Sequence, residues 1–229
     1  MKYENIKKAL FLSRPNRFIA NIEIDGREEI CHVKNTGRCK ELLLPRANIY
    51  VQEQQSKRRK TKYDLISVYK QERLINIDSQ APNKLFHEWV LESNFFKDVQ
   101  LIKPEARYKN SRFDFYLETS DRKILVEVKG VTLEENGVAM FPDAPTERGV
   151  RHLHELGLSI KEGFEAYVFF VIQMKGVRYF TPNVKTHPAF GETLVQAANL
   201  GVQVLAFDCE VTSNTITPRD MVDCKLQLL

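Results

Sequence analysis

Three charged residues of one predicted hairpin have the types and the spacing of a metal-dependent hydrolytic site. Asp114 lies in the segment SRFDFYLE, and Glu127 and Lys129 lie two residues apart in the apolar segment KILVEVKG. Burying a charge is costly unless it is paired or used, so charges inside an apolar strand need an explanation. Two adjacent carboxylates repel each other, and a divalent cation bound between them is the simplest relief of that repulsion.

The register of the hairpin decides whether the carboxylates meet. If Ser120–Asp121 is the centre of the turn, Asp114 lies directly opposite Glu127, with Cβ atoms about 4.5–5.5 Å apart. Ser-Asp is a weaker turn signal than Asn-Gly, and a loop with an odd number of residues would shift the register. The alternative is a solvated face with two diagonal salt bridges, Asp114–Lys129 and Arg112–Glu127.

The site interpretation assigns a role to each residue. Asp114 and Glu127 are the predicted metal ligands, with the Val128 carbonyl as a third, and hard oxygen ligands select Mg²⁺ or Mn²⁺ over softer metals. Lys129 would orient the attacking water or stabilise the charge that develops on a phosphate. Glu88, on the preceding predicted helix, is a further carboxylate, although an exposed helix charge is the simpler interpretation.

The elements ahead of this hairpin form a separate predicted domain. Residues 9–78 show no long helical period, and five short strand patterns predict an OB-like barrel: RFIANIEID, EEICHVK, ANIYVQEQ, YDLISVYK and RLINID. After DSQAPNK the apolar residues of KLFHEWVLES recur at helical spacing. We therefore place a domain boundary near residue 80, between a barrel over 1–80 and a second domain over 81–229.

The order of helix and strand patterns after residue 80 predicts an α/β fold for the second domain. After the hairpin come a loop over about 131–146, a helix in ERGVRHLHELGLSIKEG with Thr146 as its N-cap, and an apolar strand AYVFFVIQM. A helix within HPAFGETLVQAANL, ended by Gly201, and a strand VQVLAFDCE complete the set. This order predicts a mixed sheet that is covered by helices on both faces.

The charge of the chain is unevenly distributed. Residues 1–78 carry 17 Lys and Arg against 10 Asp and Glu, a net charge of +7, whereas the remainder carries −3. Chance asymmetry is the alternative, but such a division favours a polyanion-binding module beside one with carboxylate chemistry. The predicted nucleic-acid-binding residues are all cations: Arg38, Lys40, Lys57, Arg58, Arg59, Lys60, Arg148 and Arg151. Contacts of this kind with phosphates are not sequence-specific by themselves.

Several classes of protein are disfavoured. No segment is long and apolar enough to span a bilayer, so no membrane association is expected. The four cysteines show no CxxC spacing, which argues against zinc and suits reduced thiols in the cytoplasm. An enzyme acting on a phosphorylated sugar is ranked last, because the sequence has no glycine-rich loop to hold the phosphate.

The motifs resemble two known families. Asp114 followed by Glu127-Val128-Lys129 resembles the PD-(D/E)XK nuclease motif, with Phe113 where the motif has proline. Most of the chain is similar, in order, to the sugar fermentation stimulation protein A (SfsA) family, in CHVKNTGRCKELLLP, KYDLISV, NIDSQAPN, SRFDFYLE, EVKGVTL and GVAMFPDAPTERGVRHLHEL. One departure is Arg46, where that family usually has glycine after the proline of LLLP.

The resemblance implies an N-terminal OB-like barrel and a C-terminal PD-(D/E)XK-like α/β domain. It also implies a DNA-binding protein linked to the regulation of sugar metabolism. We therefore expect a cytoplasmic nucleic-acid-binding protein, with DNA favoured over RNA, whose C-terminal domain is a Mg²⁺- or Mn²⁺-dependent nuclease. The alternative is a DNA-binding regulator whose nuclease-like domain is inert. The sequence leaves open whether the chain forms a homodimer.

Overall fold

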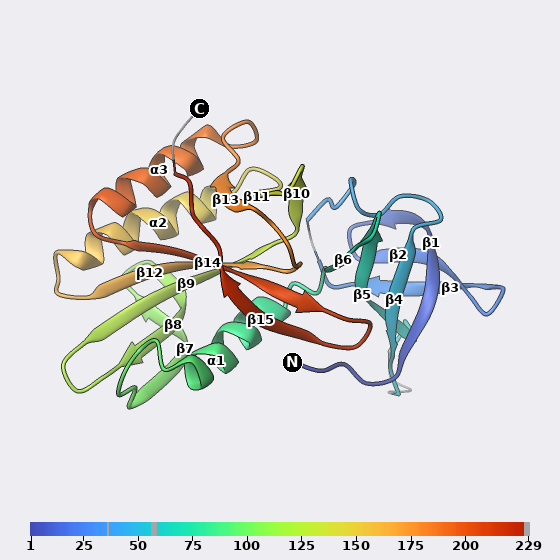
Figure 1. Cartoon of the computed structure of the whole chain (residues 1–229), viewed down its shortest axis with the longest axis horizontal. Coiled ribbons are helices and arrows are strands. Elements are labelled where there is room, and N and C mark those ends of the chain that lie inside the picture. Colours follow the sequence, from blue (N-terminus) through green and yellow to red (C-terminus); the bar gives the residue numbers. More distant parts are fainter. Residues whose placement is uncertain (36, 56–58, 227–229) are drawn as a thin grey trace.

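A β-barrel and an α/β domain lie side by side in the computed structural model, which describes residues 1–35, 37–55 and 59–226 (Figure 1). The barrel is built from β1 (Ile6–Asn16), β2 (Ile19–Ile24), β3 (Arg27–Val33), β4 (Asn48–Glu53) and β5 (Tyr63–Lys70). These strands pair in the order β3-β2-β1-β4-β5, and a parallel pairing between β3 and β5 closes the barrel. Alternate residues such as Ile22, Val33, Val51 and Leu65 fill its interior. The predicted OB-like barrel is confirmed.

The first barrel strand was not predicted, and this is a correction. The prediction began the barrel at RFIANIEID and counted RLINID as its fifth strand. In the structure the fifth strand is β1, whereas RLINID supplies β6 (Arg73–Asn76), which extends from β5 toward the second domain. The reason is that β1 has two register irregularities against β2, which break the simple alternation of apolar and polar residues.

Arg46 occupies a backbone conformation that glycine adopts more easily. Its φ is 70°, in the left-handed region. The turn is nevertheless formed, since the Arg46 backbone N–H donates to the Phe11 carbonyl at 2.7 Å. The Arg46 guanidinium also donates to the Glu23 carboxylate at 2.9 Å. The chain therefore keeps the turn with an arginine at a strained position.

The second domain is built on a six-stranded mixed sheet. Its order is β15-β14-β12-β9-β8-β7, from β7 (Leu101–Tyr108), β8 (Ser111–Glu118), β9 (Lys123–Val131), β12 (Glu165–Ile172), β14 (Gln203–Val211) and β15 (Ile216–Met221). The pairs β9–β12 and β12–β14 are parallel and the others antiparallel. Helix α1 (Ala81–Ser93) covers one face, and α2 (Glu147–Ile160) and α3 (Pro188–Asn199) cover the other (Figure 1). The predicted α/β architecture is confirmed.

A second correction concerns the segment predicted as a loop over 131–146. Most of it is a hairpin of β10 (Leu133–Glu135) and β11 (Val138–Phe141), which forms a small sheet with β13 (Tyr179–Pro182). These strands are only three and four residues long, too short for alternation to reveal. The predicted ends of two helices are confirmed: Thr146 caps α2, and Gly201, with φ 107°, follows α3.

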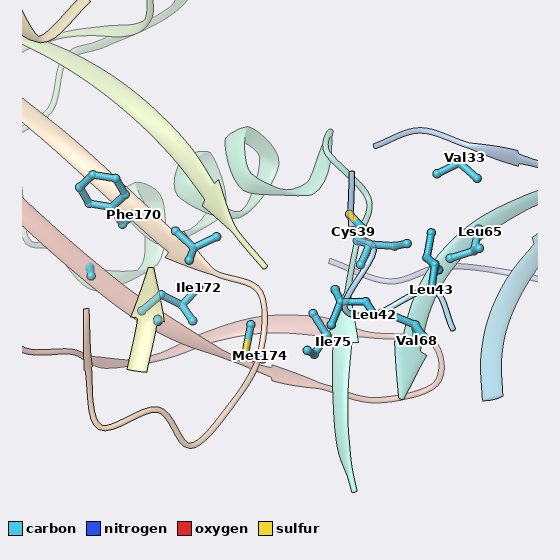
Figure 2. Packing of buried hydrophobic residues seen from close by; sticks show 14 of the residues in the cluster. Val33, Cys39, Leu42, Leu43, Leu65, Val68, Ile75, Phe170, Ile172 and Met174 are labelled. Carbon is cyan, nitrogen blue, oxygen red and sulfur yellow. The ribbon is translucent and has the colours of Figure 1, made fainter. Parts of the chain in front are cut away.

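The two domains share one apolar core. Figure 2 shows Leu42, Leu65 and Ile75 of the barrel domain in the same cluster as Phe170 and Met174 of the α/β domain. The backbones are joined as well, because the Asn76 N–H donates to the Gln173 carbonyl at 2.9 Å. None of the helices in the described part of the chain is long and apolar enough to cross a membrane.

Candidate metal and nuclease site

The hairpin of β8 and β9 has the predicted register. Tyr116 pairs with Leu125, and the Thr119 N–H donates to the Arg122 carbonyl at 3.0 Å, which makes Ser120–Asp121 the centre of the turn. The ladder of paired residues ends at Phe115 and Val126. Asp114 and Glu127 are the next residues on the two strands beyond that last pair. Their contacts with neighbouring residues are made by their side chains and not by the backbone ladder.

Asp114 is held by two hydrogen bonds from different elements. Its carboxylate accepts the Val128 backbone N–H at 2.8 Å and the Asn83 side-chain amide, from the first turn of α1, at 2.9 Å. Burial, followed by the nearby negative charge of Glu127, raises the pKa of the Asp114 carboxyl above its ordinary value. The hydrogen bonds and Lys129 oppose this shift without cancelling it. A cation at this position would therefore be stabilising.

Glu127 is almost completely buried, with 2% of its side chain exposed. Its Oε1 atom contacts both the Lys129 ammonium and Nδ1 of His152, the latter at 2.7 Å. Burial alone would raise the pKa of the Glu127 carboxyl, but Lys129 and then His152 outweigh it, so the pKa is lowered. Within the described residues, Oε2 of Glu127 has no hydrogen-bond partner.

His152 reaches the site because α2 packs on the sheet. The helix begins at a cap in which Thr146 Oγ1 accepts the Gly149 N–H at 3.1 Å, and His152 is buried one turn later. The Arg148 Nε lies 3.4 Å from Nε2 of His152. An arginine can only donate, so Nε2 is the acceptor and Nδ1 carries the proton that is donated to Glu127.

The solvated-face alternative does not fit these contacts. Lys129 pairs with Glu127 rather than Asp114, and Arg112 lies 3.6 Å from Glu105 rather than beside Glu127. Neither diagonal pair is formed between these described residues. Glu88 is also accounted for: its carboxylate binds the amino group of Met1 at 2.8 Å and lies outside the site.

The residues present fit a hard divalent cation. Glu127 offers a buried oxygen that no described residue contacts by a hydrogen bond, and Asp114 is a carboxylate whose ionisation its surroundings disfavour. No group of three or more His, Cys, Asp and Glu side chains gathers anywhere in the described residues. Backbone or water oxygens would therefore complete the coordination, and the Val128 carbonyl is the predicted protein contribution.

The predicted nucleic-acid-binding cations have different surroundings. Lys57 and Arg58 lie outside the described residues. Arg59 forms an ion pair with Asp64, which is 1% exposed, so part of its positive charge is neutralised within the barrel. The others are exposed at the surface: Arg38, Lys40, Lys60, Arg148 and Arg151.

Two site residues were not singled out in advance. Asn83 lies 31 positions before the Asp114 that it binds, in a segment read only as a helix start. His152 lies 25 positions after its partner Glu127, and no local pattern joins the two. Arg148 and His152 are four residues apart and share a helix face, but only the packing of α2 shows that this face meets Glu127.

The fold and the site define a class of protein: an OB barrel joined to an α/β domain with two carboxylates at the end of a strand ladder. Residues 12–77 match the model of the SfsA N-terminal OB domain, and residues 80–215 match that of the sugar fermentation stimulation protein RE domain. The chain belongs to the sugar fermentation stimulation protein (SfsA) family.

Relatives match over nearly their whole length. A sugar fermentation stimulation protein homolog of Desulfitobacterium hafniense is 64% identical over 226 residues, which are 99% of each chain. The homolog of Clostridium beijerinckii is 62% identical over 97% of this chain and 99% of its own. The solved structure of Pyrococcus furiosus SfsA, in complex with Ca²⁺, superimposes with a TM-score of 0.89 at 30% identity over 98% of both chains.

Proposed function

We propose that this protein is a divalent-metal-dependent phosphodiesterase acting on nucleic acid, with DNA favoured over RNA. The observation that carries the proposal is the pair of Asp114 and Glu127, in which a buried oxygen of Glu127 has no partner among the described residues. The Ca²⁺ complex of the Pyrococcus furiosus relative supports a site for hard cations, and the OB domain supports nucleic-acid binding.

Each residue has a role in this reaction. Asp114, Glu127 and the Val128 carbonyl would hold Mg²⁺ or Mn²⁺, and when bound the cation supplies Lewis-acid activation of the phosphodiester and of water. Lys129 contacts Glu127 and would hold the attacking water or stabilise negative charge on the phosphate. His152 fixes the orientation of the Glu127 carboxylate through Nδ1.

The exposed cations would hold the substrate. Five of them are exposed and would contact phosphates: Arg38, Lys40 and Lys60 on the barrel and Arg148 and Arg151 on α2. We assign the same role to Lys57, Arg58 and Arg59. The four cysteines are all free thiols, which suits the proposed cytoplasmic location.

The test uses end-labelled single- and double-stranded DNA and RNA with Mg²⁺ or Mn²⁺. We expect cleavage that falls at least about 100-fold in Asp114→Asn and in Glu127→Gln, because a ligand of the metal is lost. Asp121→Asn is the matched control, since the Asp121 side chain is 78% exposed in the hairpin turn. Binding without cleavage of any of the four substrates would contradict the proposal and favour the non-catalytic DNA-binding regulator.

A further inference from the structure

A cleft of about 220 Å³ adjoins the candidate metal site at the junction of the two domains. Asn83 and Val128, which bind Asp114, form part of its wall. The barrel contributes Asn35 and Gly37, and the α/β domain contributes Asp143 and Gln173. If the proposed function is correct, a group bound in this cleft would lie next to the scissile phosphate, and the role of the cleft rests on that function.

Gln173 presents a hydrogen-bond acceptor to the cleft. The side chain is 1% exposed, and its Nε2 donates to Asn76 Oδ1 at 2.9 Å and to the Asp78 carbonyl at 3.1 Å. These two bonds fix the amide so that Oε1 points toward Gly130, and no donor to Oε1 is found in the described part of the protein. A Cβ at Gly130 would lie 2.6 Å from that oxygen, so only glycine leaves room for it beside the cleft.

Asp143 presents a second acceptor to the cleft. The carboxylate is half-buried, and none of the described residues donates a hydrogen bond to it. The barrel loop comes close to it at Gly37, where a Cβ would collide with Asp143 Oδ2 and lie 2.8 Å from Asn35 Oδ1. Two glycines from different domains thus allow two acceptor groups to lie directly against the backbone at the cleft.

The rest of the cleft is partly apolar. Pro82, Leu133, Met140 and Phe141 contribute to its walls. A polar cleft with acceptor groups and some apolar wall suits a flat ring that carries N–H donors, and the negative charge of Asp143 disfavours a phosphate there. Among groups that accompany a phosphodiester, a nucleobase has this chemistry.

We propose that the cleft binds an unpaired nucleobase next to the scissile phosphate and prefers bases that carry an exocyclic amino group. The amino groups at adenine N6 and cytosine N4 can donate hydrogen bonds to Asp143 and Gln173. The corresponding atom of thymine, O4, is an acceptor that the carboxylate repels. A base stacked within a duplex cannot enter the cleft, so the preferred substrate class is single-stranded or locally unpaired nucleic acid.

The test measures binding without cleavage. Fluorescently labelled oligo-dC, oligo-dA and oligo-dT of equal length are titrated with the full chain in EDTA, and Kd is read from anisotropy. We expect oligo-dC and oligo-dA to bind about tenfold more tightly than oligo-dT, within the range of discrimination given by one well-placed base contact. In Asp143→Asn this ratio should fall to below about twofold.

The ratio of affinities is the readout because removing a negative charge raises the affinity for every oligonucleotide. Asp121→Asn removes the same charge from the exposed turn and should leave the ratio unchanged. Gly130→Ala is a second variant: the added methyl group displaces Gln173 Oε1 or Pro82 and should also lower the ratio.

The outcomes separate this inference from the proposed function. Equal affinity for the three oligonucleotides, or a ratio that survives Asp143→Asn, overturns the base cleft while leaving a metal-dependent phosphodiesterase intact. Asp143→Asn is also tested in the cleavage assay. If it leaves the affinity ratio unchanged but needs more Mn²⁺ for cleavage, the base cleft is overturned and Asp143 is assigned to the metal site. Failure to bind any of the three oligonucleotides overturns the base cleft, and the cleavage assay with Mg²⁺ or Mn²⁺ then decides the phosphodiesterase separately.

Discussion

Asp114 and Glu127 should affect the stability of the metal-free protein with opposite signs. The fold raises the pKa of Asp114 through burial and the charge of Glu127, so it disfavours the ionised form. It lowers the pKa of Glu127 because Lys129 and His152 outweigh burial, so it favours the ionised form. At neutral pH, Asp114→Asn should therefore increase the free energy of unfolding, and Glu127→Gln should decrease it.

The magnitudes follow from the contacts. Removing one partner of a buried ion pair costs about 3–5 kcal/mol. The Lys129 side chain keeps 15% exposure, so water relieves part of this cost and we expect Glu127→Gln to cost about 2 kcal/mol. In Asp114→Asn the new side chain keeps the hydrogen bond from the Val128 N–H. It also keeps the hydrogen bond with Asn83 if the Asn83 amide turns over. We therefore expect the free energy of unfolding to rise by about 1 kcal/mol. For a chain of this size, 1 kcal/mol changes Tm by about 2–4 °C.

The pH dependence provides an independent check. The Asp114→Asn gain should be complete at neutral pH and should vanish as the pH falls below the unfolded value of 3.8, where Asp114 is protonated in both states. The stabilising effect of Glu127 should be complete above its unfolded value of 4.5 and be lost as the pH falls through its lower folded pKa.

The assay is urea and thermal unfolding in EDTA from about pH 3 to pH 8. The control Asp121→Asn should change the free energy of unfolding by less than about 0.5 kcal/mol. Shifts of the same sign in Asp114→Asn and Glu127→Gln at neutral pH would refute the reasoning. So would a gain in Asp114→Asn that persists at the acid end of the range.

Three further predictions concern stability alone. Arg46→Gly should be more stable than Arg46→Ala by about 1 kcal/mol in urea unfolding, because only glycine relieves the positive φ; equal stability would count against strain there. Thr146→Ala should cost about 1 kcal/mol through loss of the α2 cap, and Thr146→Ser should restore most of it, as measured by thermal unfolding. Gln173→Leu removes two hydrogen bonds between the domains and should lower the calorimetric Tm by about 3–9 °C, whereas the exposed control Gln203→Leu should leave it nearly unchanged.

The hairpin could be predicted because its information is local. Alternation with a period of two residues fixes the faces of β8 and β9, and the turn at Ser120–Asp121 fixes the register. The cap at Thr146 and the end of α3 at Gly201 are local in the same sense. Each of these features depends on a few neighbouring residues.

The surroundings of the carboxylates could not be predicted in this way. His152 and Asn83 reach the site only when α2 and α1 pack on opposite faces of the sheet. The partner of Arg59 is a buried aspartate of the barrel, which a run of basic letters does not reveal. Short strands such as β10 and irregular ones such as β1 also carry too little periodicity to be recognised.

The apolar core that runs from the barrel into the α/β domain has a mechanical consequence. Beside the cleft, the described side chains of the two domains pack against one another, which holds the barrel at a set distance from the carboxylate pair. Under the proposed function, a nucleic-acid strand bound to the barrel would be cut at a set number of nucleotides from the point where it is bound. The lengths of the cleavage products would then depend on the spacing between the two domains.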